Sequence, residues 1–481
     1  MIDIYLSVDV ASATEELCAA YADPDGPAKL VALLQGPVDK ALGTSDAGRV
    51  SFGVPHCVSN DLKAPLRVDK DGSLQPLGAS TESPPKPETL VIPLRLDDAK
   101  GPVAVDEKTL KALVSEIQGA QDACADMAFG TSYVPAPAWC RGQGLGRGVG
   151  SREAALEVIG QDFLEGNGLD GDGVNVLIVD QGLDGSQLAP NFVGGWRVGN
   201  RLPGQLQFVR GVTRNYHGML IARNVLSVAP KVRLWDCPLI PSRIDNVNAF
   251  LSAAEAHLEW VRIWIIIFRI RGWFPGPWVI VNAWSTFDRS TEMPFGHYSE
   301  NSAHSFNRLM RRFAERTIDV VFAAGNCGQF CPDRRCGIYD IGPGASIYGA
   351  PAHASVLTVG ATRTDGLWAG ASSQGPGPDD RAPPSPSLER LARQKPDLCA
   401  PSFFADTHNA HAFNGGTSTA SALAAGVVAA LRGKSDATGD LPTDQFFQIL
   451  RDTADRSGAP LWDGRLGYGM INPEGAYPLL P

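Results

Sequence analysis

One stretch near the C-terminal end constrains the fold more than any other. It reads Gly415-Gly416-Thr417-Ser418-Thr419-Ala420 and continues as an Ala- and Val-rich run to Leu431. The run is long enough for about four helical turns and is small and apolar on almost every side, so it predicts a buried helix. Ser418 would then lie at the start of that helix, where backbone N–H groups and the helix dipole favour negative charge. A serine there is either a helix cap or a nucleophile whose oxyanion intermediate the helix start stabilises.

Size and charge exclude several classes of protein. The chain has 481 residues, 44% of them hydrophobic and 20% charged, so it can bury a sizeable core and hold two or three domains. The formal net charge is −10 and no long basic run is present, which argues against nucleic acid and anionic membranes as partners. The most apolar segment, residues 260–270, contains Arg262 and Arg269 and is too short to span a bilayer. A packed helix is expected there, with a surface patch for a partner or a membrane as the alternative.

The first residues and the cysteines bear on the compartment. Residues 1–9 carry acids where a secretion signal needs a basic region and an apolar core, and they are predicted to form a β-strand. The nine cysteines are an odd number and are scattered along the chain. We therefore expect a cytoplasmic protein in which most cysteines are free thiols.

Residues 1–125 are predicted to form a separate α+β domain. Residues 2–8 and 90–96 are predicted strands, and residues 105–117 are a predicted helix with apolar side chains on one face. Residues 126–150 are rich in Gly and Pro and are predicted to be a linker. Their glycines superficially match a dinucleotide-binding pattern, but no strand precedes them, so cofactor binding is not expected.

From residue 151 to residue 481, predicted strands alternate with predicted helices. The strands are apolar and rich in β-branched residues, at 174–179, 232–235, 278–285, 319–326 and 355–361. Helices are predicted between them, at 246–270 and 306–317 among others. This alternation predicts an α/β fold with a doubly wound, mainly parallel sheet. Residues 374–396 are rich in Pro, Arg and Asp and are predicted to be a surface loop.

Polar residues stand where several of these elements end or begin. Asp180 follows the strand at 174–179, His217 opens an apolar helix, and Asn326 ends the strand at 319–326. In open parallel sheets, sites form at the carboxyl ends of the strands. Each residue alone would fit a turn, a cap or the core. Together with Ser418 they give the order Asp, His, Asn, Ser.

In this order and with their neighbours, the segments resemble those of the subtilisin-like serine proteases, or subtilases. The shared patterns are D-x-G at Asp180, H-G-x-x-x-A at His217, A-x-G-N ending at Asn326, and G-T-S-x-A around Ser418. Residues 371–376, 395–401 and 467–472 resemble further segments of the family. The resemblance extends from about residue 155 to about residue 477 and implies a subtilisin-like peptidase domain over residues 151–481.

The resemblance implies a serine endopeptidase with a triad. Ser418 would attack a peptide carbonyl, His217 would take the proton and pass it on, and Asp180 would hold the imidazole tautomer. Asn326 and the Ser418 backbone N–H would bind the oxyanion. The peptide or protein substrate would lie as an extended strand. The residues implied to contact it are Asn282, Ala283, Ser285, Ala323, Ala324, Gly325, Gly416 and Thr417.

The chain also departs from the family pattern. Gln181, Met219, Arg223 and Ala422 stand where the family usually has Thr or Ser, Thr, Gly and Pro, respectively. None of these positions supplies a reacting atom, so the departures bear on efficiency and specificity. An acyl transferase or peptide cyclase on the same scaffold is one alternative, and a catalytically silent binding module is another.

Three questions stay open at this point. Residues 1–125 would be either a propeptide-like inhibitor and folding chaperone or a regulatory domain that binds a partner. Cys327, Cys331 and Cys336 would be free, bridged or, with a fourth ligand, bound to a metal. No cofactor is expected to be required. The family often binds structural calcium, but no residue of this chain is assigned to such a site.

Overall fold

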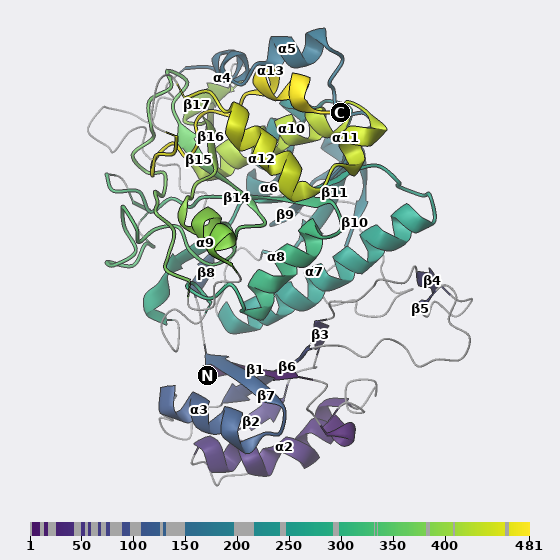
Figure 1. Cartoon of the computed structure of the whole chain (residues 1–481), viewed down its shortest axis with the longest axis vertical. Helices are drawn as coiled ribbons and strands as arrows, with labels where there is room; N and C mark the ends of the chain where they lie inside the picture. The colour runs from purple at the N-terminus through teal and green to yellow at the C-terminus, as the bar shows by residue number, and fades with distance from the viewer. Residues whose placement is uncertain are drawn as a thin grey trace.

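A seven-stranded sheet forms the centre of the larger part of the chain (Figure 1). Its strand order is β10-β11-β9-β12-β14-β15-β16, and each neighbouring pair is parallel. The strands are β9 (Asn175–Asp180), β10 (Phe192–Gly195), β11 (Arg233–Pro238), β12 (Trp278–Asn282), β14 (Ile318–Ala323), β15 (Leu357–Thr362) and β16 (Leu398–Pro401). From β9 the chain first forms β10 and β11 on one side and then runs outward through β12, β14, β15 and β16 on the other, so the predicted fold class is confirmed.

The structure is a computed structural model. It describes residues 2–9, 14–17, 26–42, 50–52, 56–58, 66–68, 74–76, 89–96, 107–125, 128–130, 150–196, 216–240, 247–291, 298–330, 332–333, 335–380, 385–406, 409–456 and 461–481. Statements below concern these residues.

Helices cover both faces of the sheet. Successive strand residues point to opposite faces, so Ile178 of β9 joins the core under α6 (Tyr216–Val228) and α10 (Gly416–Arg432). Val179 joins the opposite core, under α7 (Val247–Ile270) and α8 (Ser305–Ala314). The remaining elements of this part are α4 (Arg152–Val158), α5 (Gln161–Gly166), η1 (Gly185–Gln187), β13 (Ser285–Asp288), η2 (Arg289–Thr291), η3 (Ala350–Ala352), α9 (Pro386–Arg393), β17 (Phe404–Asp406), β18 (Asn409–Asn414), α11 (Asp436–Asp440), α12 (Thr443–Thr453), α13 (Pro473–Ala476) and η4 (Tyr477–Leu479).

Helix α10 is buried along nearly its whole length, as its small apolar residues predict. It lies directly against α6. A Cβ atom added to Gly426 of α10 would come within 2.7 Å of the Val228 Cβ on α6. The glycine therefore lets the two helix backbones approach closely, and this fixes how the start of α10 sits relative to the start of α6.

Helix α7 contains the most apolar stretch of the sequence and is the packed helix that was expected. Phe268 contacts Trp196, Trp235 and Trp278 in the core beneath it, with ring centroids 5.5–6.2 Å apart. In the part of the chain that the structure describes, no helix is both long enough and apolar enough to cross a membrane.

The N-terminal part forms an antiparallel sheet of order β2-β6-β1-β7, flanked by two helices. Its elements are β1 (Ile2–Asp9), α2 (Gly26–Leu42), β2 (Val50–Phe52), β3 (His56–Val58), β4 (Leu66–Val68), β5 (Leu74–Pro76), β6 (Thr89–Leu96), α3 (Glu107–Glu116) and β7 (Ala120–Ala125). Strand β1 contacts α7, and Figure 1 shows this sheet beneath α7. The elements agree with the predicted α+β arrangement.

Two predicted irregular segments contain regular structure. Within the predicted linker, the three residues of β8 (Ala128–Gly130) form a strand that pairs antiparallel with β13. The other linker residues, apart from Gly150, lie outside the described residues. Within the predicted loop 374–396, α9 forms because Ser385 caps its first turn and Ala392 is buried. Short elements held by distant partners leave no periodic pattern in the sequence.

Candidate active site

Asp180 and His217 form a buried pair. Asp180 is the last residue of β9 and His217 lies in the first turn of α6. The His217 Nδ1 atom is 2.8 Å from each carboxylate oxygen, and the two residues are 0% and 2% exposed. The Gln181 backbone N–H also donates to Asp180 Oδ1, at 2.7 Å. Because an ionised carboxylate only accepts hydrogen bonds, this geometry assigns the proton to Nδ1 and leaves Nε2 as the basic nitrogen.

The start of α6 is packed tightly against the turn that follows Asp180. A Cβ atom on Gly218 would lie 2.3 Å from the Gly182 carbonyl oxygen, so glycine is required for this approach. Met219 is buried and its sulfur accepts the Asp184 backbone N–H at 3.2 Å. Arg223 lies further along α6 and donates to the Gln187 side chain. Both departures from the family pattern are thus accommodated by contacts with the turn.

Ser418 lies in the first turn of α10, as predicted. It is 5% exposed, and its hydroxyl donates to the Ala283 carbonyl oxygen at 3.1 Å. Ala283 directly follows β12, so Ser418 lies beside the carboxyl end of the strand next to β9 in the sheet. The nucleophile candidate and the Asp–His pair therefore belong to the same edge of the sheet.

Asn326 is joined to the residue before Ser418. Its Oδ1 atom accepts hydrogen bonds from the Thr417 backbone N–H at 2.9 Å and from the Thr417 hydroxyl at 3.1 Å. The Thr417 hydroxyl in turn accepts the Gly325 N–H at 3.1 Å. Because Oδ1 faces these donors, the Nδ2 donor is turned away from Thr417. Gly416, at φ 76°, leaves room for the amide, since a Cβ there would lie 3.1–3.2 Å from it.

A buried polar network that the sequence did not predict links α6 to the segment before Ser418. The Asn224 amide on α6 donates to Asn414 Oδ1 at 3.0 Å. Arg152, at the start of α4, donates to Asn224 Oδ1 at 2.8 Å. Both asparagines are fully buried. The three residues are far apart in the sequence, so no local pattern could have revealed the network.

The predicted substrate-binding segment adjoins a strand of the same chain. Ser285 and Thr286 of β13 pair with Gly130 and Phe129 of β8, respectively. Ala323, Ala324 and Ser285 are buried, and Asn282 is the last residue of β12. Gly325, at φ 104°, would place a Cβ 2.8 Å from the Ser373 hydroxyl. The backbone edge on which a peptide strand was expected is thus paired with residues 128–130.

Two of the three neighbouring cysteines are bridged. Cys327 and Cys336 form a disulfide directly after Asn326, and Cys331 lies outside the described residues. Cys237 and Cys399 are free and buried. Within the described ranges, no group of His, Cys, Asp and Glu side chains is arranged to hold a metal ion.

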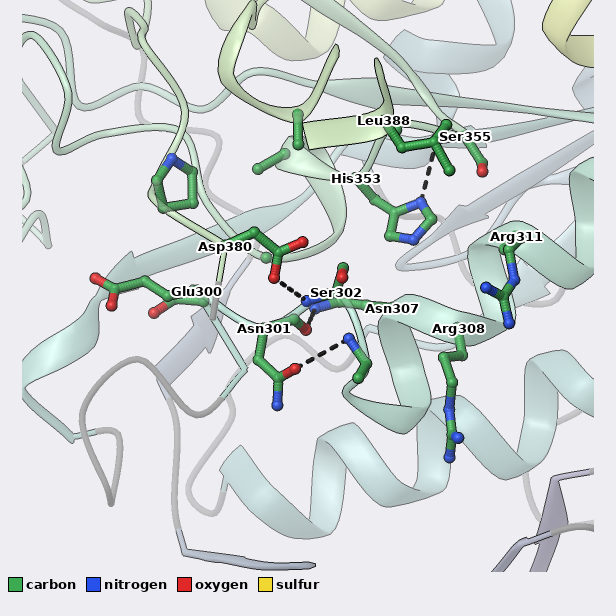
Figure 2. Close-up of a pocket in the computed structure, with 17 residues that line it drawn as sticks. Glu300, Asn301, Ser302, Asn307, Arg308, Arg311, His353, Ser355, Asp380 and Leu388 are labelled. Carbon is green, nitrogen blue, oxygen red and sulfur yellow. Dashed lines mark hydrogen bonds between the residues drawn. The ribbon is translucent and has the colours of Figure 1, made fainter. Parts of the chain in front are cut away.

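Figure 2 shows a pocket of about 280 Å³ that contains none of the predicted site residues. His353 lines it and accepts the Ser355 N–H at Nδ1, and Asp380 accepts the Ser302 N–H. Burial, together with Lys395 and Arg311, lowers the pKa of His353 to about 3, so its ring is neutral near pH 7. The pocket is separate from the edge of the sheet that carries Asp180, His217 and Ser418.

An Asp–His pair and a helix-start serine thus lie at the carboxyl edge of a parallel sheet, where sites of open α/β sheets form. Residues 215–469, more than half of the chain, match the model of the subtilase family, peptidase S8. The chain therefore belongs to the subtilase family.

Solved structures agree on the fold. Fervidolysin from Fervidobacterium pennivorans, described as a keratinolytic enzyme related to subtilisin, is 16% identical with a TM-score of 0.53. The match covers 99% of this chain and 60% of the fervidolysin chain, so this chain spans less than two thirds of that protein. MycP1 from Mycobacterium smegmatis is 16% identical, covering 73% of this chain and 90% of MycP1, with a TM-score of 0.46. A lanthipeptide protease is also 16% identical, covering 68% of this chain and 95% of its own, with a TM-score of 0.47. A search of curated proteins gave no match.

Proposed function

We propose that the chain hydrolyses peptide bonds with Ser418 as nucleophile, His217 as general base and Asp180 as the residue that orients the imidazole. The contact of His217 Nδ1 with both Asp180 oxygens, 2.8 Å away in a buried setting, carries this proposal. It directs the basic Nε2 away from the carboxylate. The buried carboxylate also stabilises the imidazolium that forms when His217 takes a proton.

The reaction then follows from these positions. The Ser418 hydroxyl turns from the Ala283 carbonyl toward His217, gives its proton to Nε2 and attacks the substrate carbonyl carbon. His217 returns the proton to the leaving amine as the C–N bond breaks. A water molecule then attacks the acyl-enzyme, and His217 again serves as base.

Asn326 is proposed to stabilise the oxyanion of both steps. The Thr417 N–H and hydroxyl hold its carbonyl oxygen, and this leaves the Nδ2 donor as the group that can face the substrate. The Ser418 backbone N–H lies in the first turn of α10, where helix N–H groups have no intrahelical acceptor. These two donors would act together on the developing negative charge.

For residues 1–125 we propose the propeptide-like role rather than partner sensing. The support is the pairing with β13 of β8, which follows residues 1–125 in the chain, because β8 lies on the edge to which a peptide substrate would add as a strand. The intact chain would therefore restrict access of other peptides. A cut between β8 and residue 150 would free the edge and raise activity.

The test incubates the full chain and Ser418→Ala with a diverse peptide library and identifies the products by mass spectrometry. We expect cleavage by the wild type alone, and faster cleavage after the chain has been nicked between residues 130 and 150. Equal cleavage by both proteins would refute the nucleophile assignment. Cyclic or amine-capped products would favour the acyl transferase or cyclase. No product, together with no Ser418 labelling by an organophosphonate, would favour a binding module.

The cytoplasmic location stays a prediction. The Cys327–Cys336 disulfide bears on it, because such bonds persist mainly in oxidising compartments. Alkylation of protein taken directly from its own cells, before and after reduction, would show whether the bridge exists there. A protein alkylated at both cysteines without reduction would support the cytoplasmic prediction.

A further inference from the structure

A second carboxyl group is buried near Asp180. Asp236 lies on β11, which pairs with β9 so that Asp236 is opposite Ile178 and Pro238 is opposite Asp180. Leu234 and Ile178 both belong to the core under α6, and side chains two apart on a strand share a face. The side chains of Asp236 and Asp180 therefore point to the same face of the sheet. Asp236 is 1% exposed.

Asp236 holds the turn that follows Asp180. Its Oδ2 atom accepts the backbone N–H of Leu183 at 3.2 Å. On its other side the same turn touches α6, where Gly182 meets Gly218 and the Asp184 N–H meets the Met219 sulfur. The turn is thus clamped between β11 and the helix that carries His217. Leu183 itself is fully buried in the core beneath that helix.

The two carboxyl oxygens of Asp236 differ in their hydrogen bonding. Oδ1 is buried and has no hydrogen-bond partner among the residues that the structure describes. Burial raises the pKa of Asp236 to about 7; the Leu183 N–H acts against this rise, and the Asp180 carboxylate adds to it. Near and below that pH a neutral Asp236 can still accept the Leu183 N–H without adding a second negative charge beside Asp180.

The described ionisable groups near Asp236 come from three elements. They are Asp180 on β9 together with its partner His217 on α6, and Cys237, the next residue on β11. Cys237 points into the opposite core, where burial raises its thiol pKa well above the ordinary value. No described cation forms an ion pair with Asp236, and the charge that acts on it is the Asp180 carboxylate.

We propose that Asp236 is a positioning residue for the Asp180–His217 pair. Its carboxyl group fixes the Leu183 N–H, and through it the turn that sets Asp180 against His217. This inference rests on the proposed protease function and deepens it. A displacement of about 1 Å in such a pair can cost on the order of 10²-fold in rate, so a remote anchor has a measurable effect.

Three variants of the full chain test the proposal by steady-state peptide cleavage. Asp236→Val removes the acceptor and keeps a similar shape, Asp236→Asn keeps an acceptor without a charge, and Leu234→Ala removes packing from the same face of β11. We expect Asp236→Val to lower kcat about 10- to 100-fold with KM within about threefold. We expect Asp236→Asn and Leu234→Ala to keep kcat within about threefold of wild type, although Leu234→Ala lowers the melting temperature.

The pH profile gives a second readout, which a merely structural role would not move. In the wild type, Asp236 gains its charge beside the Asp180–His217 pair as the pH rises through about 7, so kcat/KM should change through that pH, and Asp236→Asn should remove this step from the profile. This readout decides the matter if Asp236→Val does not fold.

The proposal is overturned if Asp236→Val keeps wild-type kcat, if Leu234→Ala loses as much kcat as Asp236→Val, or if Asp236→Asn has the same pH profile as the wild type. Failure of the proposed function would look different: the wild type itself would show no cleavage that depends on Ser418.

Discussion

The two faces of the central sheet are packed with side chains of different size. On the face under α6 and α10, small residues bring backbones together, as Gly218 does against Gly182 and Gly426 does against Val228. On the face under α7 and α8, large aromatic side chains fill the space, among them Trp196, Trp235, Phe268 and Trp278. The first face delivers the starts of two helices, with His217 and Ser418, to the carboxyl edge of the sheet.

One buried carboxyl group on each face shows the difference in electrostatics, because the pKa values of the two groups shift in opposite directions. Under α7, Arg262 and Arg312 pair with the buried Glu259 and, although burial opposes ionisation, hold its pKa below the ordinary value. Under α6, Asp236 has no ion-pair partner among the described residues, and burial raises its pKa. Glu259 therefore has neutralising partners, whereas the carboxyl group of Asp236 lies close to Asp180 without one among the described residues. Substitutions on the face under α6 and α10 should therefore alter catalysis, and substitutions on the face under α7 and α8 should alter stability.

The largest effect is expected from Asp180→Asn. The amide keeps the shape but favours the wrong imidazole tautomer, so kcat should fall about 10⁴-fold with little change in stability. Asp184→Asn is the matched control, since Asp184 belongs to the same turn and accepts from Ser186 and Gln187 instead of a histidine. Steady-state kinetics at several pH values check the prediction. Equal losses in the two variants would contradict the assignment of Asp180.

Phe268→Ala should have its effect on stability alone. Loss of a buried ring next to three tryptophans should lower the free energy of unfolding by about 3–5 kcal/mol, while kcat of the folded protein stays within about threefold. Urea unfolding and active-site titration measure the two quantities separately. A drop in kcat per folded molecule above tenfold would show that the two faces are not independent.

Asn326→Ala should remove one oxyanion donor. We expect kcat to fall about 10²–10³-fold, the range known for this loss in subtilisin, with KM nearly unchanged. Ser346→Ala is a useful control, because Ser346 is a buried polar residue of the following segment that bonds only to backbone groups. The ratio of the two effects separates oxyanion stabilisation from general loss of hydrogen bonding.

The smallest effect concerns how stability depends on pH. In the folded state Asp236 keeps its proton up to about pH 7, whereas the unfolded chain loses it near the ordinary pKa of 3.8. The folded state therefore binds more protons between these values, and stability falls as the pH rises through them. Asp236→Asn should raise the melting temperature at pH 8 by more than it does at pH 4. An equal shift at both pH values would contradict the raised pKa.

The sequence predicted those helices and strands whose pattern lies within a single continuous run of residues. The apolar run at 174–179 became β9, and the Ala/Val run after Ser418 became α10. His217 and Asp180 were predicted together only through the family resemblance, and they do lie in contact. The roles of the triad and of Asn326 stay predictions until activity is measured.

What the sequence could not predict depends on register and on distant partners. Asp236 faces Asp180 only because β11 pairs with β9 in one particular register. Likewise, Asn224 meets Asn414 only because α6 packs against α10, and the three residues of β8 form a strand only because β13 offers an edge. These contacts join residues that are distant in the sequence, so only the folded structure reveals them.

The most direct test of the central claim is covalent labelling of the full chain with an organophosphonate, followed by peptide mapping. The claim is that Ser418 is a nucleophile activated by the buried Asp180–His217 pair. It predicts one adduct, on Ser418, that is formed by the wild type, strongly slowed in His217→Ala and in Asp180→Asn, and absent in Ser418→Ala. An adduct on another residue, or one that forms on Ser418 at the same rate in all variants that keep this serine, would contradict it.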